Sequence, residues 1–252
     1  GQVILFDLSK KKVNRGIPLY KKMPVIDFTI ADDARLVYSH QLTIHNIEKS
    51  KSVSLKGHES TPFFLTVHPI CPLVLSCANL LLLHDIRVQK PVNVQFITPP
   101  AYGLEYFPDG QFFLQSGEPC RIGNTRWVRT LMNGMGSVSR SGKHIVTNDL
   151  DGKICMWDWR DSTEVLSLTG IKNKEVYQPV YFGTVENRTR NILFLDEDCE
   201  FMVYDILKET TRTSSIQPMD NSKLYVDQNP ATTQEFFRYT HCGTIQLFRF
   251  DA

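Results

Sequence analysis

The sequence predicts an all-β protein made of repeated four-stranded sheets. One short strand motif returns at near-constant intervals along the 252 residues. The strands are rich in Val, Ile, Leu, Phe and Tyr, turn-forming residues separate them, and no stretch keeps the 3.6-residue periodicity of an amphipathic helix. A period of about 40–45 residues with four strands per unit is typical of a β-propeller. We therefore expect a single β-propeller domain over residues 1–252.

The repeated motif is an alternating apolar strand that ends in an aromatic residue or His, followed by Asp, Asn or Arg. The interval between successive copies is 39, 39, 73, 47 and 44 residues, and the aromatic or His positions are Phe6, His45, His84, Trp157, Tyr204 and Phe248. Because 73 residues is close to two periods, we expect a degenerate copy inside that interval, at Gly117 to Val128. Six copies and this degenerate copy predict seven blades.

Two further strands precede the motif in each complete unit. The segments PVIDFTIADDARLVYS, PFFLTVHPICPLVLSC and AYGLEYFPDGQFFLQS each contain an apolar strand, a turn and a second apolar strand. The terminal units are shorter: the first starts with strands near Val3–Leu8 and Ile17–Tyr20, and the last ends at Thr244–Phe250. We therefore expect a fragment of a longer chain, whose ring is completed by absent sequence or by another chain.

Composition indicates an intracellular protein, nuclear or cytoplasmic, with no membrane partner. The net charge is +1, and hydrophobic residues make up 42% of the chain, enough for a sizeable core. The longest apolar run, Pro72 to Ile86, is too short to span a bilayer and is interrupted by Asn79. The six cysteines are scattered without a C-x-x-C pair, so we expect buried thiols rather than disulfides.

No catalytic, metal or cofactor motif stands out. Phosphate-binding loops and nucleophile elbows are absent from the sequence, and the seven His residues lack zinc-ligand spacing. Asn148 to Lys153 resembles part of a calcium loop but lacks its distal Glu. Four acids between Leu195 and Glu200 lie between apolar strands, which favours a solvated turn over an acid–base pair. We expect a protein that is not an enzyme and needs no cofactor.

Several residues resemble the WD40 repeat family. Trp157-Asp158 is a full WD dipeptide, and Gly57-His58 is a Gly-His pair 26 residues before His84. The resemblance covers essentially the whole chain and implies a propeller in which a buried hydrogen-bond network links a His, a Ser or Thr, a turn Asp and the Trp of each repeat.

No single repeat of this chain holds that complete network. The repeat ending at Trp157 offers Thr147 and Asp151 without a Gly-His pair, and the repeat opened by His58 offers Ser76 with Asn79 and His84 in place of Asp and Trp. We therefore expect a divergent member, in which His84 replaces a structural Trp.

An Arg follows the WD-type Asp by two residues in two copies, at Asp85/Arg87 and Asp158/Arg160. This W-D-x-R box resembles that of substrate receptors of cullin-4 ubiquitin ligases. The resemblance implies that these four residues lie at the docking face for a large multi-propeller adaptor protein. Arg suits such a contact because its planar guanidinium binds in a bidentate manner. The alternative is that each Asp–Arg pair only staples its own turn.

A basic stretch without acids runs from Arg121 to Lys143 and includes Arg126, Trp127 and Arg129. Arg beside an exposed aromatic is typical of a protein hot spot or a nucleic-acid contact. The alternative is a solvated loop with Trp127 buried. Together these features predict a non-catalytic protein-interaction scaffold, specifically a ligase substrate receptor acting on chromatin. A scaffold subunit of another complex and a nucleic-acid-binding propeller remain the alternatives.

Overall fold

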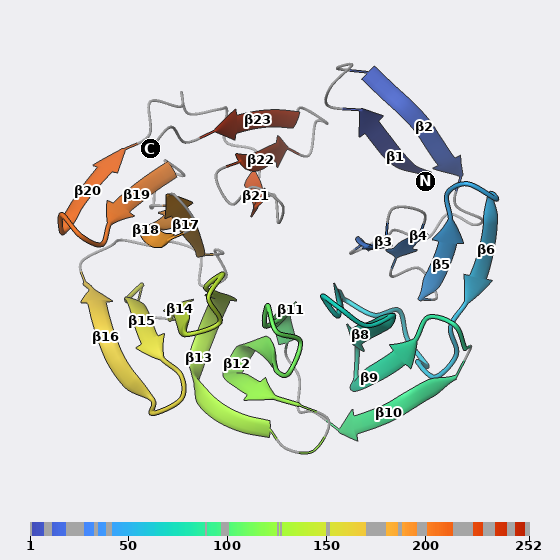
Figure 1. Cartoon of the computed structure of the whole chain (residues 1–252), viewed down its shortest axis with the longest axis horizontal. Helices are drawn as coiled ribbons and strands as arrows, with labels where there is room; N and C mark the ends of the chain where they lie inside the picture. The colour runs from blue at the N-terminus through green and yellow to red at the C-terminus, as the bar shows by residue number, and fades with distance from the viewer. Residues whose placement is uncertain are drawn as a thin grey trace. The chain divides into compact units, whose positions relative to one another are not determined.

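The computed structural model consists of strands and turns in the residues it describes, and the strands are labelled β1 to β23 (Figure 1). The chain divides into two compact units, Gly1–Thr98 and Pro99–Ala252. The prediction of one domain therefore stays a prediction. The described residues are 2–7, 12–18, 28–32, 35–38, 42–88, 90–96, 101–124, 126, 128–149, 152–169, 180–185, 188–195, 201–213, 224–228, 235–240 and 245–249.

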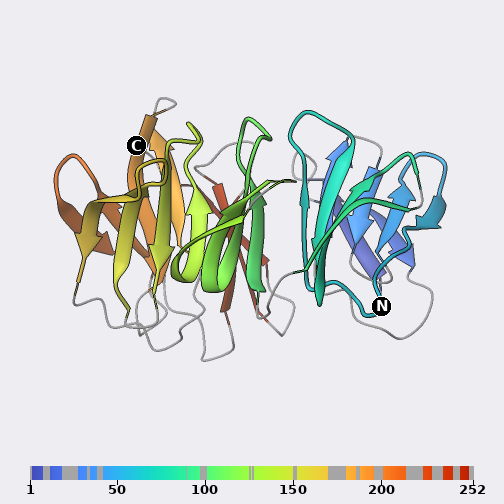
Figure 2. The same cartoon turned by 90° about the horizontal axis from the view of Figure 1, so that it is seen from below.

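The first unit holds three antiparallel sheets in which successive strands pair with one another. Figure 2 shows the strands of each sheet running side by side. The two-stranded sheet is β1 (Gln2–Asp7) and β2 (Lys12–Pro18); the four-stranded sheets are β3 (Phe28–Asp32), β4 (Arg35–Tyr38), β5 (Thr43–Asn46) and β6 (Lys51–Ser54), then β7 (Phe64–Val67), β8 (Leu73–Cys77), β9 (Leu80–Asp85) and β10 (Pro91–Phe96).

An apolar core fills the space between the two four-stranded sheets of this unit. Val37 and Ile44 project from β4 and β5 and meet Leu65 and Val74 of β7 and β8. The first strands of the two sheets, β3 and β7, lie next to each other. Each sheet therefore buries one face against its neighbour, as the predicted blades require.

The second unit holds sheets of six, four and three strands, again with sequential antiparallel pairing. The six-stranded sheet is β11 (Ala101–Tyr106), β12 (Phe113–Gly123), β13 (Val128–Val138), β14 (His144–Asn148), β15 (Ile154–Asp158) and β16 (Thr163–Leu168); the others are β17 (Tyr181–Val185), β18 (Arg188–Leu195), β19 (Phe201–Asp205) and β20 (Thr210–Thr213), then β21 (Leu224–Gln228), β22 (Glu235–Thr240) and β23 (Ile245–Arg249).

The six-stranded sheet consists of two groups of paired strands, β11–β12–β13 and β13–β14–β15–β16. The two pairing groups share β13. This strand pairs with β12 up to Gly134 and with β14 from Met135 onward. Gly134 has a φ of +137°, and a Cβ there would lie 2.1 Å from the carbonyl oxygen of Asn148. Only glycine therefore allows β13 to change partners at this point.

The degenerate copy at Gly117 to Val128 lies in the pairing group formed by β11, β12 and the first part of β13, so the additional unit that the sequence predicts is present. The residues of the copy form the outer half of β12 and the turn into β13. β12 and β13 are 11 residues long each and form one long hairpin, and β13 then continues into the next pairing group. With the two pairing groups counted separately, the described residues form seven units, and the short terminal sheets end close to where the sequence placed them.

Where β13 stops pairing with β12, side chains act as hydrogen-bond partners for its backbone N–H and carbonyl groups. The Ser116 hydroxyl accepts the Gly136 N–H at 2.9 Å and donates to the Gly136 carbonyl at 3.1 Å. The Glu105 carboxylate accepts the Val138 N–H at 3.0 Å. These three bonds replace a backbone ladder at the seam between the two pairing groups, and buried backbone groups require such partners.

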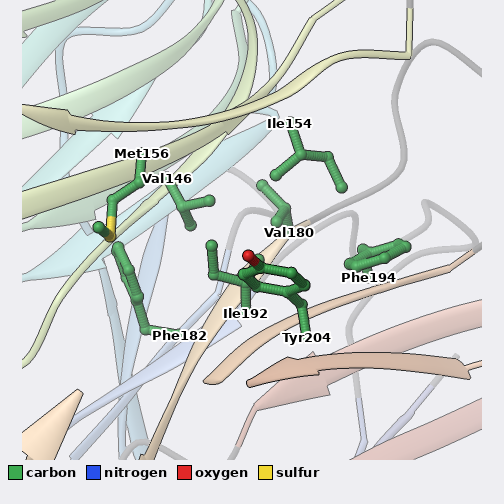
Figure 3. Close-up of a cluster of buried hydrophobic side chains, with 8 residues drawn as sticks. All are labelled: Val146, Ile154, Met156, Val180, Phe182, Ile192, Phe194 and Tyr204. Atoms are coloured by element: carbon green, nitrogen blue, oxygen red, sulfur yellow. The ribbon is translucent and has the colours of Figure 1, made fainter. Parts of the chain in front are cut away.

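The apolar cores of this unit lie between neighbouring sheets. One joins β14 and β15 to β17, β18 and β19, with Phe182, Ile192 and Tyr204 turned toward Val146 and Met156 (Figure 3). Another gathers Phe107, Leu114, Cys120, Ile122, Val138, Ile145 and Trp159 on the six-stranded sheet.

Replacing Ser116 with Ala tests the seam. The Gly136 N–H and carbonyl would lose their shared partner in a site where Ser116 itself is 2% exposed. We expect the free energy of unfolding to fall by about 1–3 kcal/mol, the cost of leaving buried polar groups unpaired. Chemical denaturation measures it, and Ser60→Ala, at an exposed loop position, serves as the control. Equal stability of the two variants would contradict this role for Ser116.

Candidate functional site

The polar residue that ends the third strand of a sheet caps the turn that follows it. Asn46 Oδ1 accepts the Lys49 N–H at 2.7 Å, and Asp205 Oδ1 accepts the Leu207 N–H at 3.0 Å. Asp85 and Asp158 do the same toward the backbone N–H of the residue two positions on, at 2.9 and 3.2 Å. The Asp of the repeated motif is therefore a turn-capping residue, because short polar side chains bond the backbone just after them.

Three of these turns share one backbone shape. Residues Asn46 and Lys51, Asp158 and Thr163, and Asp205 and Thr210 pair across four-residue turns. The last turn residue has a positive φ in each: 53° at Ser50, 58° at Ser162 and 53° at Glu209. The turn geometry thus repeats even where the sequence differs.

The capped turn sends the next two side chains in opposite directions. The residue after the Asp packs into the core between sheets, as Ile86, Trp159 and Ile206 show. The residue after that points to solvent: Arg87 has a 67% exposed side chain, and Leu207 is 77% exposed. The fold therefore presents the Arg of each predicted W-D-x-R box. Leu207 occupies the same position of its turn, where the sequence has no Arg to signal it.

In the first box, Arg87 and Asp85 form a bidentate ion pair. Arg87 Nε lies 2.9 Å from Asp85 Oδ1, and Nη2 lies 2.5 Å from Oδ2. The hydrogen bonds from Arg87 lower the pKa of Asp85 to about 2. Exposed Ile70 and Val88 lie on the two turns at this end of the sheet. The contacts of this box therefore fit the alternative in which an Asp–Arg pair stabilises its own turn.

The second box is built differently. The guanidinium of Arg160 lies over the ring of Trp159, with Cζ 5.7 Å from the ring centroid. Asp158 accepts the backbone N–H of Arg160 and has Lys143 Nζ at 3.8 Å. Within the described part of the chain, no carboxylate pairs with the Arg160 side chain. Among the described residues, its charge is therefore not neutralised by an ion pair.

Trp159 anchors this second box in the core. Its ring centroid lies 5.1 Å from that of Phe107 and 5.0 Å from that of Phe112, and its Nε1 donates to the Gly142 carbonyl at 2.8 Å. A buried Trp with its N–H satisfied is a rigid base. This contact explains why an aromatic residue stands where Ile86 and Ile206 stand in two other repeats.

The basic stretch and the second box meet at one surface. Arg129 Nη1 donates to the Arg160 carbonyl at 3.4 Å, and Nη2 donates to Ser162 Oγ. Together with Lys143 these residues form the Arg129–Arg160 surface, defined as Arg129, Lys143, Trp159, Arg160 and Ser162.

The other predicted members of the basic stretch lie apart from these contacts. Arg126 is exposed, and its backbone N–H bonds to Asn124, whereas Arg121 is half-buried. Trp127 lies outside the described residues. Which of these residues bind a partner stays a prediction.

The predicted buried networks are present in partial form. His58 Nε2 lies 2.7 Å from Ser76 Oγ, which in turn donates to the Leu82 carbonyl at 3.4 Å. Trp157 Nε1 donates to Thr147 Oγ1 at 3.0 Å. Asp151 lies outside the described residues.

Two members of these networks depart from the family pattern. Asp149 caps the β14–β15 turn by accepting the Lys153 N–H at 2.8 Å. His84 is fully buried where the family has Trp, and its Nε2 donates to the Lys56 carbonyl at 2.9 Å. The Nδ1 atom of His84 is buried without a hydrogen-bond partner in the described residues.

Burial of the thiols is confirmed in part. Cys77, Cys120 and Cys155 are buried and Cys71 is exposed, because Cys71 lies on the β7–β8 turn between two prolines. Burial raises the pKa of Cys77 and Cys120 to about 12, which keeps them protonated and unreactive. Cys199 and Cys242 lie outside the described residues.

A metal-binding group of side chains or a membrane-spanning helix would each point to a different function. The described residues contain no group of three or more His, Cys, Asp and Glu side chains that could hold a metal ion. They also contain no helix with the length and apolar character needed to cross a membrane. The four acids at residues 196–200 lie outside the described residues.

Comparisons with known proteins identify the fold. No family model matches the chain, and no curated protein matches it. Among solved structures, a chain of the mitotic checkpoint complex aligns with a TM-score of 0.81 and 12% identity, covering 100% of this chain and 82% of that one. The β-propeller domain of Cps50 (Swd1) from Myceliophteria thermophila aligns with a TM-score of 0.67 and 14% identity, covering 90% and 87%. The chain has a WD40-type β-propeller fold, as predicted.

The paired histidines predict a loss of stability in acid. Burial, followed by the charge of His84, lowers the pKa of His58 from 6.5 to about 4, and burial lowers that of His84 as well. Below pH 6.5 the unfolded chain therefore binds more protons than the folded one, so stability falls until the pH reaches about 4.

The melting temperature should thus drop as the pH is lowered through this window, and His58→Gln should drop less. Gln keeps an amide N–H for Ser76 but does not titrate. Thermal melts of both proteins across the window measure the difference, and parallel pH profiles would argue against the histidine pair as the cause.

Proposed function

We propose that this chain is a non-catalytic protein-interaction scaffold that docks a partner protein through the Arg side chains presented by its third-strand turns. The observation that carries the proposal is the state of Arg160. Its guanidinium is held over a buried Trp ring and has no carboxylate partner among the described residues. A charged side chain that is already ordered and not neutralised loses little entropy when a partner binds it.

The chemistry of the Arg129–Arg160 surface suits an acidic partner. Arg129, Lys143 and Arg160 supply three cationic side chains at the β15–β16 turn. Arg is among the residues most enriched at interface hot spots. Asp158 is engaged by Lys143 and by the Arg160 backbone, so it holds the turn and leaves the Arg160 side chain to the partner.

Arg87 supports a second contact of a different character. Its bidentate bond to Asp85 fixes the guanidinium, and its side chain stays 67% exposed beside the apolar Ile70 and Val88 turns. A fixed, exposed cation with apolar neighbours is typical of the polar rim of a protein interface. The two boxes thus offer one paired and one unpaired Arg, each at the same position of its turn.

The specific partner that we propose is the multi-propeller adaptor of cullin-4 ubiquitin ligases, with this chain as a substrate receptor. The resemblance of the two W-D-x-R boxes supports it, and both Arg side chains are exposed as that docking requires. The fold alone does not choose among scaffold functions. One of the structural neighbours is a component of the mitotic checkpoint complex, which supports the broader scaffold function.

Changing Arg87 and Arg160 to Ala together tests the proposal. We expect binding of the purified cullin-4 adaptor to weaken at least tenfold, since each Arg contributes on the order of 1.4 kcal/mol or more at a hot spot. The melting temperature should stay within a few degrees, because surface substitutions change stability little. Binding is measured by surface plasmon resonance, with Arg212→Ala on the exposed outer strand β20 as the matched control.

The result separates three functions. Adaptor binding that is unaffected by the double substitution, or absent in the parent chain, rejects the ligase function. Loss of other partners from affinity purifications of the double variant would then still support a scaffold. Salt-dependent binding of an oligonucleotide that falls in Arg126→Glu with Arg129→Glu would favour the nucleic-acid alternative.

A further inference from the structure

Ser162 occupies a distinctive place on the Arg129–Arg160 surface. It is the last residue of the β15–β16 turn, half-buried, with a φ of +58°. Its hydroxyl accepts a hydrogen bond from Arg129 Nη2, although Arg129 lies 33 residues earlier, at the start of β13. The second nitrogen of the same guanidinium bonds to the Arg160 carbonyl, so Arg129 is clamped across the turn.

The equivalent turn of the next sheet carries an acid at this position. Glu209 has nearly the same φ, 53°, and its side chain is exposed. The two turns have matching lengths and matching Asp caps, at Asp158 and Asp205. The backbone of this turn therefore accommodates a negatively charged side chain at its last position.

We infer that Ser162 is a phosphorylation site whose phosphate would be held by Arg129, and that phosphorylation lowers the affinity of the Arg129–Arg160 surface for its partner. The second half of this inference rests on the proposed function. Arg is the side chain best suited to a phosphate, because its planar donors meet two phosphate oxygens at once. The guanidinium already lies within hydrogen-bond reach of the atom that would carry the phosphate.

The reaction is an ordinary phosphoryl transfer from a nucleoside triphosphate bound to a kinase. The Ser162 oxygen attacks the γ-phosphorus, and a new O–P bond forms as the bond to the β–γ bridging oxygen breaks. The hydroxyl proton passes to a base of the kinase, and the nucleoside diphosphate leaves. No group of this chain takes part in the chemistry other than the hydroxyl.

The position of the turn gives a kinase access. β16 is the last strand of its sheet, and its first three residues, Thr163 to Val165, are exposed. An edge strand that pairs on one side only opens at lower cost than a central strand. Residues 161–165, which are exposed apart from the half-buried Ser162, can therefore open as an extended segment while Trp159 keeps its place in the core.

The expected consequence is a change of charge at the docking surface. A phosphate adds about −1.5 to −2 charges two residues from Arg160. It would neutralise Arg129 and face the exposed Asp161 in the same turn. An acidic partner would then meet a surface whose positive charge is largely cancelled.

The first test isolates the contact between the phosphate and Arg129 and needs no partner. Phosphoserine is installed at position 162 of the full chain by genetic encoding, in the parent, in Arg129→Gln and in Arg126→Gln. Arg126 is an exposed cation of the same hairpin and serves as the matched control. We expect the phosphate to raise the melting temperature by about 2–4 °C in the parent and in Arg126→Gln, and not in Arg129→Gln. The same shift in all three proteins would overturn the role of Arg129.

The second test asks whether Ser162 is phosphorylated in cells and whether the phosphate weakens binding of the partner. Mass spectrometry of the chain isolated from cells treated with phosphatase inhibitors should find phosphate on Ser162, and a peptide seen only unmodified would overturn the assignment. Phosphoserine should then weaken binding of the cullin-4 adaptor at least tenfold. If Arg160→Ala leaves adaptor binding intact, the proposed function fails while the Arg129-dependent melting shift still stands. If Arg160→Ala weakens adaptor binding and the phosphate does not, the proposed function stands and only the inferred effect of phosphorylation on partner affinity fails.

Discussion

Strands β5, β9, β15 and β19 each end in a side chain that bonds to the backbone just after it, and this short contact fixes the turn that follows. Asp85, Asp158 and Asp205 all accept a backbone N–H two residues on. With the turn fixed in this way, the next side chain has to enter the core and the one after it has to leave it. In these repeats, core packing and the exposure of the next side chain are therefore coupled through the capping Asp.

The same coupling explains how one motif yields two different Arg environments. At Asp85 the capping carboxylate also binds the guanidinium of Arg87. At Asp158 the inserted residue is Trp159, whose ring offers Arg160 a competing surface, while Lys143 approaches the carboxylate. The identity of the core residue thus decides whether the Arg is paired within the turn or presented unpaired.

A second constraint acts at β13, where buried backbone N–H and carbonyl groups need hydrogen-bond partners. A strand that changes partners would leave N–H and carbonyl groups unpaired along its inner edge, and Ser116 and Glu105 meet them. Gly134 allows the close approach that the change requires. The long β12–β13 hairpin that results carries Arg129 to the β15–β16 turn, so the seam and the Arg129–Arg160 surface have one structural origin.

Sequence alone determined the all-β class, the repeat length and the short terminal sheets, because strand alternation and turn residues are local properties. It also identified His58, Ser76, Thr147 and Trp157 as network residues, which the distances bear out. It placed a degenerate repeat at residues 117–128, which is present, but it did not predict that this repeat shares the strand β13 with the next one. Only the tertiary structure brought Arg129 to Arg160 and Ser162, separated the two Arg environments and revealed Leu207. These depend on contacts between strands far apart in the chain, and spacing along a sequence does not specify which side chains meet across a sheet.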